Sequence, residues 1–237
     1  MTLREILRLW RRRMDDTEKP YLWSDEDAVL FANEAEREAC ERALLLEEDS
    51  SGSPIVNING KADVGTYPLD PRIIYVRSVR WGGHQLEPIS RKTLDDVPRR
   101  REYGGYFVTP WGDTTDWTTL TGTPRFFLAP QSKYLTLVRI PTSAAPIKLS
   151  VYRYPLDPMV LTDQTRGPEI PERYHVHLVD WMEHLALDNI DADKGNPARS
   201  KAKADTFTAN FGPRLDADTQ RRRRTRNSNQ VAMNPDW

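Results

Sequence analysis

The side chains with the spacing of metal ligands lie in the C-terminal part of this sequence. His177, Asp180 and His184 are three and four residues apart, so a helix would place them on one face, and Asp188 continues the row. The helical zinc-protease motif needs two histidines four residues apart with a glutamate beside the first, whereas these two are seven apart. We therefore interpret the row as a polar helix surface or a subunit contact, and predict neither a metal site nor a cofactor.

The sequence contains no recognisable catalytic motif. A Gly-x-Ser-x-Gly nucleophile elbow, a phosphate-binding loop and a dinucleotide fingerprint are all absent from it. Cys40, the single cysteine, borders a row of alanines, which predicts a buried small apolar residue rather than a nucleophile. Asp95 and Asp96 have the residue types of a glycosidase pair, but nothing distinguishes them from a solvated loop. We expect a protein that is not an enzyme.

Residues 103–123 are rich in Gly, Thr and aromatic side chains, and this stretch is too long for a simple connection. Trp111 and Trp117 within it have ring faces that suit stacking on sugars or bases. Packing within the region, or contact with a partner protein, explains the two tryptophans equally well. A glycan-binding or cell-wall-degrading protein that uses loop 103–123 is therefore the alternative function.

The strongest local charge feature is an arginine cluster near the C-terminus. Residues 221–224 and Arg226 are all arginine, and residues 214–237 carry six Arg against three Asp, a balance of +3. Such an arm suits a nucleic acid or an acidic protein groove, and a disordered solubilising tail is the simpler alternative. Trp237 favours an anchored arm, since a large apolar side chain gains from burial in a partner.

The overall composition excludes several classes of protein. With 34 Lys and Arg against 35 Asp and Glu, the net charge of −1 creates no general field that would attract nucleic acid. No stretch approaches the roughly 18 apolar residues of a membrane span. Arginines interrupt the first apolar residues, unlike a signal peptide. We expect a soluble protein that contacts no membrane and stays in the compartment where it is made.

Hydrophobic periodicity predicts helices on either side of a β-rich region. Residues 2–14 have capping-box spacing and an apolar stripe, and Ser24 is a natural cap for a second helix. A helix opening at Pro171 and another beginning at Asn196-Pro197 are predicted in the C-terminal part. The second helix has a narrow face of small side chains that would let another helix approach closely. This face carries Ala28, Ala32, Ala35, Ala39, Ala43 and Leu46.

Between about residues 53 and 155 the sequence predicts short strands. The clearest is Ile73–Trp81, which is followed by the hairpin signal Gly82-Gly83. Further strands are predicted over residues 85–89, 124–129, 134–140 and 147–154. This spacing suits an antiparallel sandwich or small barrel of roughly six to eight strands.

These elements predict an α+β protein. We expect an antiparallel helical bundle, formed by N-terminal and C-terminal helices, with an inserted β-sandwich-like or small-barrel region and an extended C-terminal tail. The expected parts are the N-terminal helices (1–50), the inserted β-rich region (51–167), the C-terminal helices (168–213) and the extended basic arm (214–237).

Three blocks of this sequence resemble the head-to-tail adaptor (connector, or head-completion) proteins of tailed bacteriophages. The first combines WSDED at residues 23–27 with NEAEREACERA at 33–43, and the second is YPLDPRI at 67–73. The third is PEIPERYH from residue 168, which runs into LVDW and then an Ala/Phe-rich helix ending at Gly212. Their order and spacing carry the resemblance over about residues 22–212.

The resemblance implies a structural role at the head–tail junction of a virion, in a protein made in the host cytoplasm. It implies a ring of about twelve copies beneath the portal that extends the DNA channel and docks tail proteins. The alternative is then a glycan-binding or cell-wall-degrading virion protein. The candidate portal-binding residues are Arg214, Arg221, Arg222, Arg223, Arg224, Arg226 and Trp237, with DNA as a further possible target. The candidate subunit or tail contacts are Glu34, Arg37, Glu38, Glu41, Trp111 and Trp117.

Overall fold

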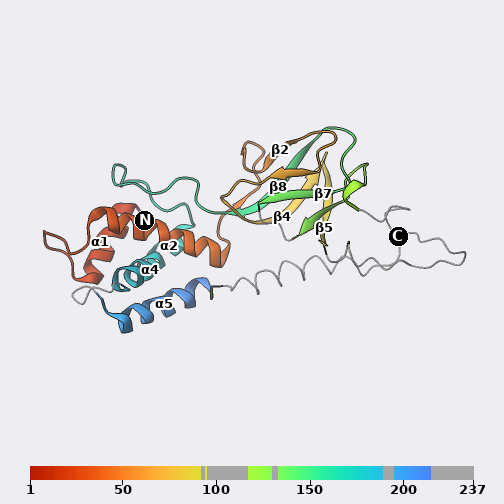
Figure 1. Cartoon of the computed structure of the whole chain (residues 1–237). Coiled ribbons are helices and arrows are strands. Elements are labelled where there is room, and N and C mark those ends of the chain that lie inside the picture. The colour runs from red at the N-terminus through yellow and green to blue at the C-terminus, as the bar shows by residue number, and fades with distance from the viewer. Residues whose placement is uncertain (92–93, 95–116, 130–132, 189–194, 215–237) are drawn as a thin grey trace, which may run out of the picture. The chain divides into compact units, whose positions relative to one another are not determined.

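The computed structural model describes residues 1–91, 94, 117–129, 133–188 and 195–214 (Figure 1). The chain divides into two units, and each buries apolar side chains of its own. The first, called here the helical unit, contains the described residues of 1–47 and 153–215. The second, the sheet unit, contains the described residues of 48–152.

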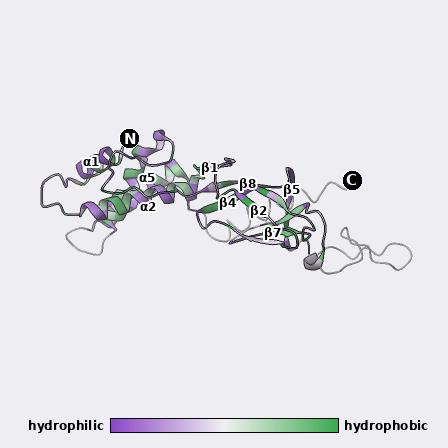
Figure 2. Cartoon of the chain, turned by 90° about the horizontal axis from the view of Figure 1, so that it is seen from above, coloured by the Kyte–Doolittle hydropathy of each residue, from purple (hydrophilic) through white to green (hydrophobic). Residues whose placement is uncertain are grey.

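Helix α1 (Leu3–Met14) confirms the helix predicted over residues 2–14, together with its capping box. The Thr2 hydroxyl accepts the Glu5 N–H at 3.3 Å, and the Glu5 carboxylate accepts the Thr2 N–H at 2.8 Å. Its buried face carries Leu3, Ile6, Leu7, Trp10 and Met14. Figure 2 shows hydrophilic and hydrophobic residues side by side on the helices of this unit, as expected when each helix packs along one face.

Helix α2 (Asp25–Ala43) begins at the predicted cap, because the Ser24 hydroxyl accepts the Asp27 N–H at 3.0 Å. Most of the predicted small-residue face is buried, and α2 packs against helix α4 (His175–Leu187). Ala43 is partly buried, and Leu46 lies beyond the end of the helix. The alanines without exposed surface are Ala28, Ala32, Ala35 and Ala39. Cys40 is also fully buried, which confirms its predicted place, and burial raises the pKa of its thiol.

Helix α4 is the centre of the helical unit, because α1, α2 and α5 (Pro197–Phe211) all pack against it. The helix expected to open at Pro171 starts with a short 3-10 turn, η2 (Glu172–Tyr174), and becomes an α helix only at His175. Its interior side is formed by Leu178, Val179, Met182, Ala186 and Leu187.

Helix α5 has both of the ends predicted for it. The Asn196 side chain accepts the Arg199 N–H at 3.1 Å, and Pro197 occupies the first helical position. Gly212 follows the last turn with a φ of 87°, a left-handed value that glycine adopts without strain. The rings of Phe207 and Phe211, both buried, lie 4.4 Å apart on the inner face of the helix.

The non-helical segment of residues 154–171, called here the crossing segment, completes the hydrogen bonding of the helical unit. Its carbonyls at Arg166 and Gln164 accept the N–H groups of Leu3 and Arg4 at 2.9 and 3.1 Å. These are donors that the first turn of α1 cannot satisfy internally. Asn33 of α2 holds the same segment by accepting the Met159 N–H at 2.8 Å and donating to its carbonyl at 3.0 Å.

The sheet unit contains one mixed sheet. Its strands are β1 (Glu47–Glu48), β2 (Asn57–Gly60), β3 (Thr66–Pro68), β4 (Ile73–Trp81), β5 (His84–Ser90), β6 (Phe126–Ala129), β7 (Tyr134–Val138) and β8 (Ala145–Arg153). The strand order is β1-β8-β4-β5-β6-β7-β3, and β2 also pairs with β8. Figure 1 labels strands β2, β4, β5, β7 and β8 of this sheet. Strands β5 and β6 are parallel, with Glu87 opposite Phe126, whereas β4–β5 and β6–β7 are antiparallel.

The expected architecture, a helical bundle with an inserted β-sandwich-like or small-barrel region, is wrong. The described residues form four α helices and a curled, mixed, eight-stranded sheet, an α+β arrangement in which the sheet is a half-barrel rather than a small insertion. Two causes explain the difference. Strands of two to four residues such as β1 and β3 leave no alternation in the sequence. Strands β5 and β6 pair in parallel although a long stretch of chain separates them, and hairpin signals predict only the pairing of strands joined by a short turn.

The β4–β5 hairpin is the best-predicted part of the sheet. Strand β4 has the predicted bounds, and Gly82 and Gly83 make the turn with φ values of 55° and 92°. The register places Trp81 opposite His84 and Val79 opposite Leu86. The strands predicted over 85–89, 124–129, 134–140 and 147–154 are confirmed as β5, β6, β7 and β8, with shifted ends.

Gly60 at the end of β2 should tolerate no side chain. A methyl group there would collide with the carbonyl oxygen of Ala145 on the paired strand and with the indole of Trp81. We expect Gly60→Ala to lower the free energy of unfolding by about 2 kcal/mol, because a packed sheet must shift to make room. Gly52→Ala is the matched control, since the nearest atom to a methyl there, Ser50 Oγ, is 3.9 Å away. Urea unfolding midpoints measure both, and equal midpoints would contradict the prediction.

Candidate interaction site

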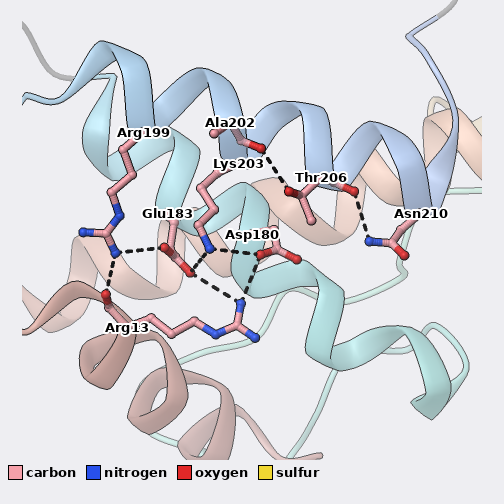
Figure 3. Close-up of polar contacts among 8 residues, drawn as sticks. All are labelled: Arg13, Asp180, Glu183, Arg199, Ala202, Lys203, Thr206 and Asn210. Atoms are coloured by element: carbon pink, nitrogen blue, oxygen red, sulfur yellow. Dashed lines mark hydrogen bonds and ion pairs between the residues drawn. The ribbon is translucent and has the colours of Figure 1, made fainter.

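A group of charged side chains joins α1, α4 and α5, with two buried carboxylates and three partly exposed cations. This central ionic cluster consists of Arg13, Asp180, Glu183, Arg199 and Lys203 (Figure 3). Glu183 exposes none of its side chain, yet its carboxylate lies 3.4 Å from Arg13, 3.2 Å from Arg199 and 3.2 Å from Lys203. Asp180 lies 3.0 Å from Arg13 and 3.5 Å from Lys203.

Helical spacing brings these five residues together. Asp180 and Glu183 are three residues apart on α4, and Arg199 and Lys203 are four apart on α5, so each pair shares one helix face. Arg13 belongs to the last turn of α1, where its backbone carbonyl also accepts a hydrogen bond from Arg199 at 2.5 Å. Three cations against two carboxylates leave the cluster one unit positive. It has the composition of a structural clamp, because every buried charge in it has a partner.

The α4 side chains with the residue types of metal ligands make separate contacts and do not meet at one point. His177 lies edge-on to the Phe211 ring, with ring centroids 6.4 Å apart, and Asp180 belongs to the central ionic cluster. Nδ1 of His184 lies 2.8 Å from the Ser200 hydroxyl, and Asp188 is exposed at the end of the helix. In the described part of the chain, no three His, Cys, Asp or Glu side chains are close enough to share a metal ion.

A second cluster, the arm root, lies where α5 ends. Nε and Nη2 of Arg42 donate to Glu38 at 2.8 Å, and its Nη1 donates to the Thr208 hydroxyl at 3.0 Å and to the Gly212 carbonyl at 3.3 Å. Nε of Arg214 approaches the same Glu38 oxygen at 3.6 Å. The arm root therefore ties the end of α5, and the first residue of the predicted basic arm, to α2.

Aromatic rings complete the arm root. The guanidinium carbon of Arg42 lies 4.6 Å from the Trp181 ring centroid and 5.1 Å from that of Phe207, which are distances of cation–π contact. Arg42 is absent from the residues predicted to be functional. The signal that would have found it is its position four residues after Glu38 on one helix face.

The structure places the predicted contact residues of α2 in different environments. Glu34 and Arg37 are exposed, whereas Glu38 is buried and paired inside the arm root. Glu41 accepts a hydrogen bond from the Tyr154 hydroxyl at 3.2 Å, and Arg37 lies 5.1 Å from the Tyr154 ring. Burial, reinforced by the neighbouring Glu41 carboxylate, raises the pKa of Tyr154 to about 12.

The remaining predicted site residues are divided between the sheet unit and the undescribed part of the chain. Trp117 lies on η1 (Trp117–Thr119) and packs, partly buried, against Ile89, Leu94 and Val138. Its contact with a subunit or tail protein stays a prediction, as do those of Glu34, Arg37, Glu38 and Glu41. The predicted residues that lie outside the described residues are Trp111, Arg221, Arg222, Arg223, Arg224, Arg226 and Trp237.

Glu36 holds the crossing segment against α2. This buried carboxylate accepts the backbone N–H groups of Glu169 and Ile170 through one oxygen, at 2.5 and 3.3 Å. Burial raises the pKa of Glu36 from its ordinary value of 4.5 to about 7, and the two N–H bonds oppose that rise. Glu36 is therefore a titratable joint between two parts of the helical unit.

The profile of the family described as "SU10 adaptor protein" matches residues 1–233, which is nearly the whole chain. No curated protein matches the sequence. Among the described residues, no helix combines the length and the apolar character that crossing a membrane requires.

Removing the charge of Glu183 should destabilise the helical unit strongly. We expect Glu183→Gln to lower the free energy of unfolding by about 3 kcal/mol, because Arg199 then loses its carboxylate partner and Arg13 and Lys203 are left with Asp180. Glu34→Gln makes the same change at an exposed position of α2 and should stay within about 0.5 kcal/mol of wild type. Urea unfolding followed by circular dichroism compares them. Similar losses in both variants would contradict a central role for Glu183.

The titration of Glu36 should appear in the pH dependence of stability. Its pKa is higher in the folded than in the unfolded chain, so its contribution is complete below pH 4.5 and is lost as the pH rises through about 7. The difference between 4.5 and about 7 corresponds to about 3 kcal/mol. We expect Glu36→Gln to gain stability relative to wild type by this amount between pH 4 and pH 8.

Unfolding free energies measured across that pH range test this expectation, and Glu34→Gln serves again as the matched control. The control should follow the wild-type curve throughout, because its carboxylate is exposed in the folded chain. A difference between Glu36→Gln and wild type that does not vary with pH would contradict the raised pKa.

Proposed function

We propose that this chain, which belongs to the SU10 adaptor protein family of bacteriophage head-to-tail adaptors, forms a ring beneath the portal that extends the DNA channel and docks tail proteins. The observation that carries the proposal is the family match over residues 1–233. An adaptor of this family acts at the head–tail junction of the virion and interacts with portal and tail proteins. Synthesis in the host cytoplasm before assembly is part of the proposal.

A ring places a specific demand on each subunit. Every copy must offer two different surfaces that fit each other, since one heterologous contact is repeated around the ring. The central ionic cluster and the arm root support this role, because they fix the helices that would carry such surfaces. We propose that the ring contains about twelve copies.

The basic arm of residues 214–237 is the proposed portal contact. Arg214 and Arg42 converge on Glu38, so the arm starts from a fixed point on the helical unit. The +3 balance of residues 214–237 suits an acidic groove on the portal, and DNA in the channel is the second possible target. Trp237 would add an apolar anchor at the far end.

We further propose that the protein acts by binding and makes or breaks no covalent bond. The buried acids Asp180 and Glu183 are held by cations, an arrangement that suits structural pairing rather than proton transfer. The alternative of a glycan-binding or cell-wall-degrading virion protein has less support. Trp117 uses its ring for packing against Ile89 and Val138.

Deletion of residues 215–237 should separate ring formation from portal binding. We expect the full-length protein mixed with its portal to give closed rings stacked on the portal in electron micrographs. The truncated protein should keep its unfolding midpoint and its rings but bind the portal at least tenfold more weakly, because the arm's charges are gone.

Two full-length variants separate charge from length. Replacing the arginines at 221–224 and 226 by lysine keeps the positive charge and should retain most portal binding, whereas replacing them by glutamine should weaken it. Wild-type protein that stays monomeric in the presence of its portal would overturn the proposed function. Undiminished portal binding by the truncated protein would overturn the role of the arm.

A further inference from the structure

The outer side of α1 carries a row of arginines without partners. Arg4, Arg8 and Arg12 follow one another at four-residue intervals and are all exposed. Among the described residues, none of their three side chains makes a hydrogen bond or an ion pair. A helix rises 1.5 Å per residue, so these arginines leave α1 about 6 Å apart, and the outer two about 12 Å apart.

The row borders a groove, called here the α1 groove, with a volume of about 320 Å³. Leu7, Arg11 and Tyr21 contribute to its lining. Arg11 is buried and neutralised, with Nη1 2.6 Å from Asp16 and Nη2 2.6 Å from Asp25. Its guanidinium carbon lies 3.6 Å from the centre of the Tyr21 ring.

The floor of the α1 groove is therefore fixed and its rim is charged. Two carboxylates and an aromatic ring hold Arg11 in place, whereas the three rim arginines make no hydrogen bond or ion pair with another described residue. Four lining arginines against Asp25 and Asp16, the two carboxylates that pair with Arg11, leave two positive charges. The groove suits a ligand that is acidic at its edges and apolar in its middle.

The outer face of α2 has that pattern. Glu26, Leu30 and Glu34 also follow at four-residue intervals, and all three are exposed, Leu30 to 55%. Neither glutamate side chain makes an ion pair or hydrogen bond within the described residues. The two carboxylates are about 12 Å apart along the helix, which matches the spacing of the outer arginines on α1.

We propose that the α1 groove of one copy receives the outer face of α2 of a second copy. Glu26 and Glu34 then lie opposite the arginines of the rim, and Leu30 covers the partly exposed Tyr21 in the groove. The two surfaces differ, so the contact is heterologous and can repeat around a ring. This inference rests on the ring in the proposed function and names the surfaces that form it.

A second copy fits the groove better than a nucleic acid does. Phosphates would satisfy the arginines of the rim, but they would leave the apolar part of the groove and the exposed Leu30 uncovered. Exposed ion pairs alone contribute little to association, so burial of Leu30 must supplement the charges. Because salt screens the charge pairs, self-association through this contact should weaken as the salt concentration rises.

Reversing the charges one surface at a time tests this contact. The groove variant combines Arg8→Glu with Arg12→Glu, and the face variant combines Glu26→Arg with Glu34→Arg. We expect each variant alone to self-associate at least tenfold more weakly than wild type in sedimentation velocity, because like charges then face each other. Arg80→Glu with Arg125→Glu is the matched control, since both arginines are exposed in the sheet unit. This control should assemble as wild type does.

Mixing the two variants, or combining their substitutions in one chain, gives the decisive result. An equimolar mixture of the groove and face variants should regain assembly, since each contact in it again joins opposite charges. A single chain with all four substitutions should do the same. Urea unfolding midpoints close to wild type establish that loss of assembly is not loss of folding.

The outcomes separate this inference from the proposed function. Wild-type protein that never self-associates, with or without its portal, would overturn both. Wild-type rings with equally complete rings of the groove variant would overturn the interface alone and leave the ring standing. Normal assembly of the groove variant, coupled with lost retention of duplex DNA, would show that the groove binds nucleic acid and would also overturn the interface.

Discussion

The helical unit depends on satisfying the buried charge of Glu183. A carboxylate without exposed surface costs several kcal/mol unless cations and hydrogen bonds compensate for it. Here the compensation comes from Arg13, at the end of α1, and from Arg199 and Lys203, on α5. Arg13 and Glu183 are 170 positions apart in the sequence. One charge therefore brings the first and last described helices together on α4.

Helix α5 is held at two points, and this bears on the adaptor role. The central ionic cluster fixes its first turns, and Arg42 fixes its end through Thr208 and the Gly212 carbonyl. The aromatic rings around Arg42 shield these polar contacts from water, which strengthens them. Under the proposed function, holding Gly212 just before the arm would favour docking, because less conformational entropy remains to be lost at the start of the arm.

Local patterns in the sequence predict local structure here, and they fail where the partner is distant. The caps at Thr2, Ser24 and Asn196 and the Gly82-Gly83 turn each depend on residues within a few positions, and all four are confirmed. The sequence does not identify Glu183 as a buried charge, because a glutamate in a helix is ordinarily solvated and its three cations lie on other helices. The row of His177, Asp180 and His184 follows helical spacing, but in the fold its members contact Phe211, the central ionic cluster and Ser200 separately.

The sheet was mispredicted for a related reason. Pairing of β5 with β6 is parallel and separated by a long stretch of chain, so no turn residue indicates it. Strands as short as β1 and β3 owe their structure to the strands beside them rather than to their own alternation. The curled sheet is consequently a property of the assembled fold, and no single run of residues contains it.

The crossing segment also determines when the helical unit can fold. The N–H groups of Leu3 and Arg4, in the first turn of α1, donate to the carbonyls of Arg166 and Gln164. These two carbonyls are synthesised only after all of residues 48–152. Residues 48–152 are therefore synthesised before these two hydrogen bonds can form. A polypeptide that ended before residue 164 would lack both carbonyls and also the whole of α4 and α5. The helical unit can close only after the residues of the sheet unit have been synthesised.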